Sequence, residues 1–94
     1  MTLSGHEGIK QLLHEDNTKQ LALLYMCVDH VRENGADCTF SVKEVLGDWS
    51  LLYNFRQLQK RGLLEVASRT RKRVYYEITD LAGVERGFAV ERKV

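Results

Sequence analysis

The sequence predicts an α+β fold with a three-helix core, a short β-strand, a C-terminal β-hairpin and extra helical segments at both ends. Apolar residues recur at spacings of three and four through much of residues 4–34, which is typical of amphipathic helices. Two β-rich runs follow at 63–69 and 74–79, separated by four polar residues. With 94 residues, 44% of them hydrophobic and 29% charged, the chain is expected to form one soluble globular domain over residues 1–94.

Helix start and stop signals organise the N-terminal part of the chain. Ser4 can cap a first helix, whose apolar stripe consists of Ile9, Leu12 and Leu13. The segment 16–18 starts a second helix, and Asn34-Gly35 ends it. Because this second helix is apolar on most sides, we expect it to be the buried central helix. Its apolar residues are Leu21, Ala22, Leu23, Leu24, Tyr25, Met26, Cys27, Val28 and Val31.

A short β-prone piece and a brief helix come next. Residues 38–40 are the β-prone piece. Ser41 and Glu44 have the spacing of a capping box, in which the serine accepts from the N3 amide and the glutamate reaches back to the cap amide. The helix that they open is expected to be short because Gly47-Asp48 ends it.

Another helix is predicted over residues 49–61. Asp48 or Ser50 can cap it, and Gly62 stops it. The helical period of 3.6 residues places its docking residues on one side. These docking residues are Leu51, Phe55 and Leu58.

The two β-rich runs are predicted to form a hairpin. Residues 63–69 and 74–79 are rich in β-branched and aromatic side chains, and the segment 70–73 joins them with a cationic tip. Tyr75 and Tyr76 alternate across the second strand, so one is expected in the core and the other at the surface.

The net charge of +1 is unevenly distributed. Residues 1–48 carry four basic and eight acidic side chains, whereas residues 49–94 carry ten basic and five acidic ones. Most of the excess lies in residues 56–73, which hold seven basic side chains against Glu65 alone. A patch this concentrated is typical of a surface that binds a polyanion, although charge runs more commonly form a solvated face.

The sequence resembles a winged helix-turn-helix domain. The motif Leu51-x3-Phe55-x2-Leu58-x3-Gly62-Leu63-Leu64-Glu65 is similar to a recognition helix with its docking residues, a glycine stop and the first wing strand. The run Arg71-Lys72-Arg73-Val74-Tyr75-Tyr76-Glu77-Ile78-Thr79 resembles the wing and second strand of regulators of the ArsR and MarR kind. The resemblance spans residues 18–87 and implies a DNA-binding transcriptional regulator.

The resemblance also implies how DNA is bound. The helix at 49–61 would lie in the major groove of double-stranded DNA, and the wing at 69–73 would contact the backbone or the minor groove. Contacts to about four to six phosphates give a slope of log K against log salt of about −4 to −5. The residues expected to bind DNA are Trp49, Ser50, Tyr53, Arg56, Gln57, Lys60, Arg61, Arg69, Arg71, Lys72 and Arg73.

One departure from the family favours an alternative function. Only nine residues separate Ser41 from Leu51, fewer than in typical members, which predicts a compressed helix-turn-helix. The outward face of the next helix also carries Trp49 and Tyr53, and protein interfaces use aromatic anchors of this kind. The alternative is therefore a winged-helix protein–protein interaction module of replication or transcription machinery.

The resemblance further implies a homodimer, since members of this size often dimerise through their terminal helices. A last helix is expected over 81–90, capped by Thr79 or Asp80 and weakened by Gly83 and Gly87. The candidate interface residues are Ile9, Leu12, Leu13, Leu81, Val84, Phe88 and Val90.

The remaining residue patterns point to no cofactor and no enzyme. Cys27, His30 and Cys38 match no zinc-ligand spacing, so we expect no metal. The sequence holds no phosphate loop, nucleophile elbow or paired acids. Two cysteines, the absence of a signal-like N-terminus and the absence of an apolar run of about 18 residues favour a cytoplasmic protein with no membrane contact.

Overall fold

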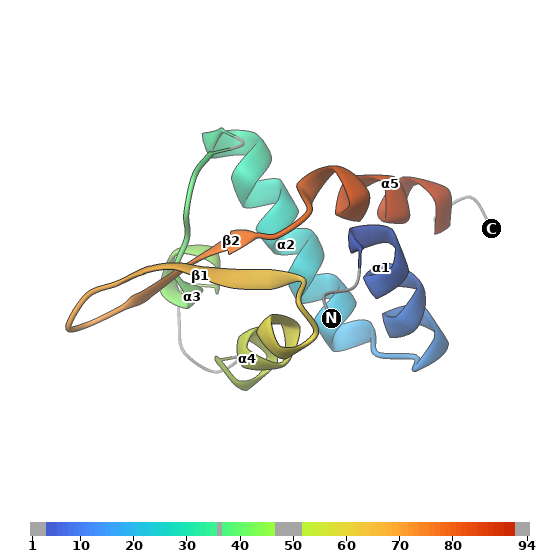
Figure 1. Ribbon diagram of the computed structural model, residues 1–94, viewed down its shortest axis with the longest axis horizontal. Helices are drawn as coiled ribbons and strands as arrows, with labels where there is room; N and C mark the ends of the chain where they lie inside the picture. Colours follow the sequence, from blue (N-terminus) through green and yellow to red (C-terminus); the bar gives the residue numbers. More distant parts are fainter. Residues whose placement is uncertain (1–3, 36, 47–51, 92–94) are drawn as a thin grey trace.

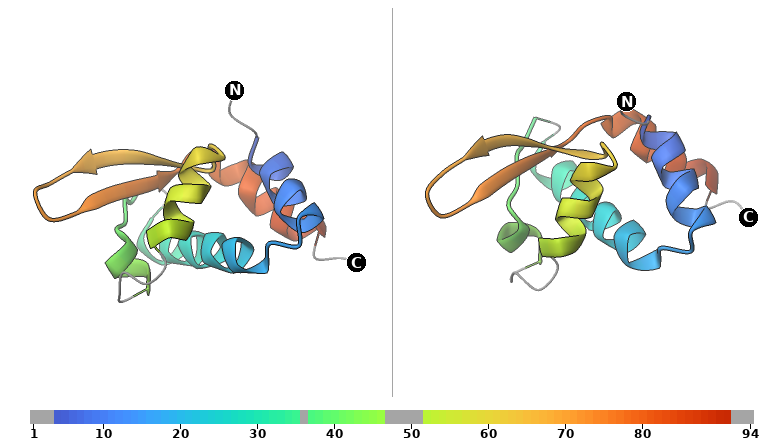
Figure 2. Two further views of the ribbon diagram at one scale, coloured as in Figure 1. Left: turned by 90° about the horizontal axis from the view of Figure 1, so that it is seen from below. Right: turned by 60° about the horizontal axis from the view of Figure 1, so that its bottom comes forward.

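The computed structural model describes residues 4–35, 37–46 and 52–91, which form an α+β fold of five helices and a two-stranded antiparallel sheet (Figure 1). Figures 1 and 2 show α1 and α5 side by side at one end of the long axis, the hairpin projecting at the other end, and α2 running between them. In chain order the elements are α1 (Gly5–His14), α2 (Thr18–Asn34), α3 (Val42–Leu46), α4 (Leu52–Lys60), β1 (Leu64–Arg69), β2 (Val74–Ile78) and α5 (Leu81–Glu91).

The predicted start signals of α1, α2 and α3 are confirmed. Ser4 Oγ accepts from a backbone N–H of the first turn of α1 at 3.2 Å, and Asn17 Oδ1 does the same for α2 at 3.3 Å. Ser41 Oγ accepts from the Glu44 N–H at 3.2 Å. The Glu44 carboxylate, expected on the cap amide, accepts from the Ser41 hydroxyl at 3.3 Å instead. The Ser41 hydroxyl therefore bonds to both the backbone N–H and the carboxylate of Glu44.

Asp80 caps α5 and also holds α1. Its Oδ1 accepts from the Gly83 N–H at 3.1 Å, and its Oδ2 accepts from the Gly5 N–H at 2.8 Å. These two hydrogen bonds favour the carboxylate and lower the pKa of Asp80. Of the two caps considered for this helix, the aspartate is the one that fills the role.

Glycines let α1 and α5 approach each other closely. A Cβ on Gly5 would lie 2.7 Å from the carbonyl oxygen of Asp80, and it would also contact the Val84 backbone nitrogen. A Cβ on Gly87 would lie 2.9 Å from Ile9 Cγ1. Helix α5, which the sequence predicts to be weakened by Gly83 and Gly87, runs unbroken over Leu81–Glu91. Its glycines let α1 pack closely against it.

Of the seven residues predicted for a dimer interface on these two helices, three are wrong because they are buried inside the chain. Ile9, Leu12 and Val84 are at most 1% exposed because they pack inside the same chain. Leu81 and Phe88 are half-buried and pack against the same core. Of the predicted set, Leu13 and Val90 remain at the surface, at 44% and 50% exposure.

An aromatic cluster fixes the base of the hairpin against α4. The ring centroids of Phe40 and Phe55 are 6.4 Å apart, and those of Phe55 and Tyr76 are 5.5 Å apart. Phe40 and Tyr76 also exchange backbone hydrogen bonds at 3.0 and 2.7 Å, so the predicted β-prone piece forms a bridge alongside β2. The buried side of α2 completes this core, while Ala22 and Met26 of the same helix are exposed. The position of α4 relative to the hairpin is thus set by buried contacts.

The predicted hairpin is confirmed, and it contains a bulge. Leu64 pairs with Ile78 and Val66 with Tyr76, which defines the inner face of the hairpin toward α4. The register then shifts between Val66 and Ser68, which leaves Ala67 as the extra residue of β1. Figures 1 and 2 show the hairpin extending well beyond the helices.

Candidate functional site

Helix α4 is oriented by its buried side. Phe55 and Leu58 are fully buried, as predicted. With 3.6 residues per turn, this places Tyr53, Arg56 and Lys60 away from the core, and all three are exposed. The third predicted docking residue, Leu51, lies outside the residues that the structure describes.

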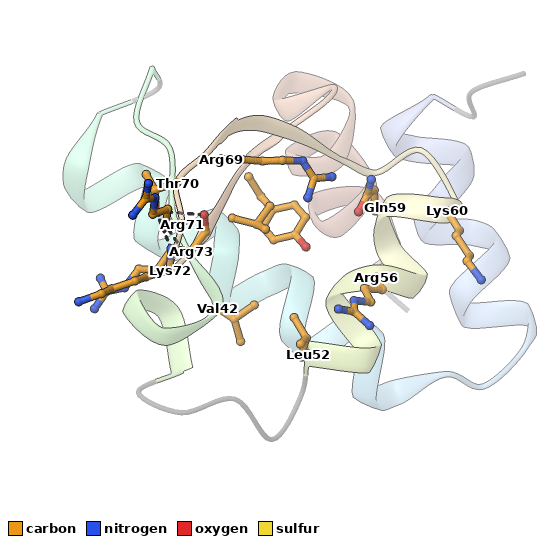
Figure 3. Close-up of a pocket in the computed structure, with 12 residues that line it drawn as sticks. Val42, Leu52, Arg56, Gln59, Lys60, Arg69, Thr70, Arg71, Lys72 and Arg73 are labelled. Atoms are coloured by element: carbon orange, nitrogen blue, oxygen red, sulfur yellow. Dashed lines mark hydrogen bonds between the residues drawn. The ribbon is translucent and has the colours of Figure 1, made fainter.

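A groove of about 520 Å³ lies between α4 and the inner face of the hairpin (Figure 3). Val42, Leu52, Val74 and Tyr76 give it an apolar floor. Its other described lining residues are polar or basic, and none of them is acidic. These are Arg56, Gln59, Lys60, Arg69, Thr70, Arg71, Lys72 and Arg73. Six basic side chains without a nearby acid in the lining produce a positive potential that attracts anions. We call this feature the basic groove.

Thr70 holds the hairpin tip in a defined turn. Its N–H donates to the Arg73 carbonyl oxygen at 2.8 Å. Its Oγ1 accepts from the N–H groups of Lys72 and Arg73 at 3.3 and 3.1 Å. These hydrogen bonds fix the backbone of the turn that carries Arg71, Lys72 and Arg73, while the side chains of Arg71 and Lys72 remain exposed.

The structure brings most of the predicted binding residues together, and others lie elsewhere. Six of the predicted basic residues line the basic groove. Tyr53 is 68% exposed on α4, while Gln57 is half-buried and does not line the groove. Trp49 and Ser50 fall outside the described residues. The compressed turn predicted between Ser41 and Leu51 also lies largely in that part of the chain.

Arg61, predicted to bind DNA, packs against the helices instead. Its guanidinium donates to both carboxylate oxygens of Glu15 at 2.6 and 2.9 Å, to Gln11 Oε1 at 3.0 Å, and to Gln20 Oε1 at 3.0 Å. The hydrogen bonds between Arg61 and Glu15 lower the pKa of Glu15 and raise the pKa of Arg61. With 19% of its side chain exposed, Arg61 ties the end of α4 to α1 and α2.

The sequence reasoning missed several groove residues. Gln59 and Thr70 are the polar ones, and Val42, Leu52, Val74 and Tyr76 form the floor. Gln59 follows Arg56 by three residues and so lies on the same side of α4, which is a signal that was available. The floor residues come from three separate segments, so no local pattern identifies them as neighbours.

The cysteines and His30 have ordinary packing roles. Cys27 is fully buried, and burial raises the pKa of its thiol. His30 packs against the ring of Phe40 with centroids 5.9 Å apart. Across residues 4–35, 37–46 and 52–91, no group of three or more His, Cys, Asp and Glu side chains could hold a metal ion.

The outer face of the hairpin carries two opposed carboxylates. Glu65 and Glu77 are direct cross-strand partners. A hydrogen bond that protonated Glu77 donates to Glu65, together with partial burial and the repulsion between the two groups, raises the pKa of Glu77. The hairpin is thus basic on its groove side and at its tip, and acidic on its outer face near the base.

Comparisons of the chain with protein-family models, with curated protein sequences and with solved structures gave no match. Within the described part of the chain, no helix combines the length and apolar character that crossing a membrane requires.

Proposed function

We propose that the protein is a winged-helix domain that binds double-stranded DNA, with a role as a transcriptional regulator in the cytoplasm. The observation that carries this proposal is the basic groove, where α4 and the hairpin contribute six cations with no acid among the described lining residues. Phosphate contacts supply most of the affinity of proteins for nucleic acids, and basic clusters of this kind provide them.

The order of the elements supports the winged-helix assignment. Helices α2, α3 and α4 precede the hairpin, and the isolated Phe40–Tyr76 bridge pairs the segment before α3 with β2. In this arrangement α4 enters the major groove, and the hairpin is the wing that contacts the backbone or the minor groove. Tyr53, Arg56 and Lys60 then face the DNA from α4, while the tip cations reach the flanking phosphates.

Binding of a random-sequence DNA duplex, followed by fluorescence anisotropy at about 50 and about 200 mM salt, tests the proposal. We expect a slope of log K against log salt of about −4 to −5. The triple substitution Arg71→Ala/Lys72→Ala/Arg73→Ala should abolish binding at the higher salt concentration.

A matched triple substitution provides the control. Lys10, Lys19 and Arg86 are exposed and lie outside the basic groove, so their joint replacement by alanine removes the same charge elsewhere. This control should retain most of the affinity. Absence of duplex binding by the unmodified protein at low salt would contradict the proposal.

A second candidate function is a protein–protein interaction module, favoured by the 68% exposure of Tyr53. An exposed tyrosine on a docking helix is a typical interface anchor. Under this function, Tyr53→Ala abolishes the capture of a protein partner, whereas the tip triple substitution leaves that capture nearly intact. Under the DNA-binding function, the tip substitutions have the larger effect.

A further inference from the structure

Arg69 lies on the groove side of the hairpin because of the bulge at Ala67. Side chains alternate along a strand, so counting from Val66 without a bulge would place Arg69 on the outer face. The extra residue changes this alternation: Ser68 pairs with Tyr75, and Arg69 pairs with Val74. Val74 lies two residues from the buried Tyr76 on β2 and shares its face, so Arg69 also faces the groove.

The opposite wall of the groove offers matching donors. Gln59 and Arg56 line the groove from α4. In Figure 3 the Arg69 side chain extends along the groove toward Gln59, whereas Lys72 at the tip extends away from α4. Arg69 therefore lies between the walls, on the side of Gln59, whereas Arg71, Lys72 and Arg73 lie together at the tip (Figure 3).

We infer that Arg69, Gln59 and Arg56 form a binding position for one backbone phosphate, with the nucleic-acid strand passing between α4 and the hairpin. The inference rests on the proposed function and deepens it. Two guanidinium groups supply charged, planar donors for phosphate oxygens, and the Gln59 amide supplies a neutral one. The floor residues Val74 and Tyr76 lie beside these donors and give the sugar an apolar surface.

This arrangement differs from a hairpin that attracts DNA by its charge alone. If charge alone matters, a cation acts equally well on either face of the hairpin. If the phosphate position exists, the guanidinium must be on the inner face. The two cases can be separated without changing the composition of the protein.

The exchange Ser68→Arg/Arg69→Ser makes this separation, because it moves the guanidinium to the outer face and keeps the net charge. We expect the affinity for a random-sequence duplex to fall about tenfold, the loss of one charge-assisted contact. The slope of log K against log salt should become shallower by about 0.9, the value for one phosphate. Unchanged affinity and slope would overturn the inference.

Further variants guard against effects on folding. The exchange Thr18→Lys/Lys19→Thr also conserves composition, and both residues are exposed on α2 outside the basic groove, so it should bind like the unmodified protein. If circular dichroism shows that the Ser68/Arg69 exchange unfolds the protein, Arg69→Gln replaces it. This single substitution should lower the affinity more than Arg71→Gln, which removes the same charge from the exposed tip, whereas charge alone predicts equal losses.

A double-mutant cycle tests whether Gln59 and Arg69 hold the same phosphate. Losses from Gln59→Ala and Arg69→Ala should be less than additive in the double variant, because either change disrupts one shared contact. Additive losses of affinity would show that Gln59 does not bind the same phosphate as Arg69.

Titrations with a single-stranded oligothymidine separate this inference from the proposed function. Duplex binding that the exchange leaves unchanged overturns the phosphate position alone. Binding of the single strand only, weakened by the exchange, retains the phosphate position and overturns the duplex function. Binding of neither nucleic acid overturns both.

Discussion

Helices α1 and α5 approach so closely that a Cβ has no room at Gly5, whereas the hairpin at the opposite end reaches into solvent with exposed cations. At the α1–α5 end, backbone contacts and the Asp80 carboxylate hold two helices together. At the hairpin end, buried aromatic rings fix only the base. Under the proposed function, stability and binding belong to separate surfaces, so substitutions should affect one property at a time.

Lys60 and Arg61 mark the boundary between the two regions. Lys60 is exposed and lines the basic groove, while the next residue donates hydrogen bonds to Glu15 and Gln20. Two adjacent cations at the end of α4 thus serve different ends of the molecule. Basic character alone does not show which residues bind a ligand.

The substitution expected to have the largest effect is Gly5→Ala. Its Cβ would lie 2.7 Å from both the Asp80 carbonyl oxygen and the Gly83 carbonyl carbon, so α1 must move away from α5. Overpacking against backbone costs about 2 to 3 kcal/mol in free energy of unfolding. Urea denaturation measures this loss. Gly8→Ala is the matched control with a smaller expected loss, because its Cβ meets the side chain of Leu63 rather than backbone.

Arg61→Ala should give the next largest loss in the free energy of unfolding, about 1 to 3 kcal/mol. The reason is that Gln20, which is 6% exposed, loses a hydrogen-bond donor. Lys60→Ala at the neighbouring position should change the free energy of unfolding by less than about 0.5 kcal/mol. Duplex affinity should show the reverse order, measured under conditions in which both variants are folded. Equal effects of the two variants on stability would show that the boundary between the regions is misplaced.

Asp80→Asn should lower the free energy of unfolding by about 1 kcal/mol at neutral pH, since an amide keeps only one of the two acceptor oxygens. The pKa of Asp80 is lowered in the folded state, so its carboxylate stabilises the protein fully above its unfolded pKa, about 3.9. That contribution is lost as the pH falls through the folded pKa. The difference between variant and unmodified protein should therefore shrink below about pH 4, which urea denaturation over a pH series would show.

Local signals in the sequence predicted much of this fold. The caps Ser4, Asn17 and Ser41 and the ends of the hairpin follow from interactions within a few residues, and the structure confirms them. The docking residues Phe55 and Leu58 follow from the helical period. These features depend on short stretches of chain, which explains why the sequence suffices for them.

The contacts that escaped prediction join distant segments. Arg61 meets residues 41 and 46 positions away, and Asp80 meets Gly5, 75 positions away. The bulge at Ala67 reverses the face on which Arg69 lies, and strand alternation alone gives the opposite answer. The candidate site was therefore predictable as a basic region, but the face of each cation required the pairing of the strands.

The smallest expected effect concerns the outer face of the hairpin, which Glu77→Gln tests. Like charges that face each other across strands cost about 0.2 to 1 kcal/mol, and solvent exposure of this pair favours the lower end. Because the pKa of Glu77 is raised on folding, the folded state binds the proton more tightly, and the penalty is full only above the folded pKa. Glu77→Gln should therefore raise the free energy of unfolding slightly at neutral pH.

This gain in the free energy of unfolding should vanish as the pH falls toward the pKa of an unfolded-state glutamate, about 4.3. Thermal unfolding at several pH values measures the gain, and a gain that persists at acid pH would show that it has a cause other than charge. Because Glu65 remains acidic and the basic groove is unchanged, duplex affinity should rise only marginally.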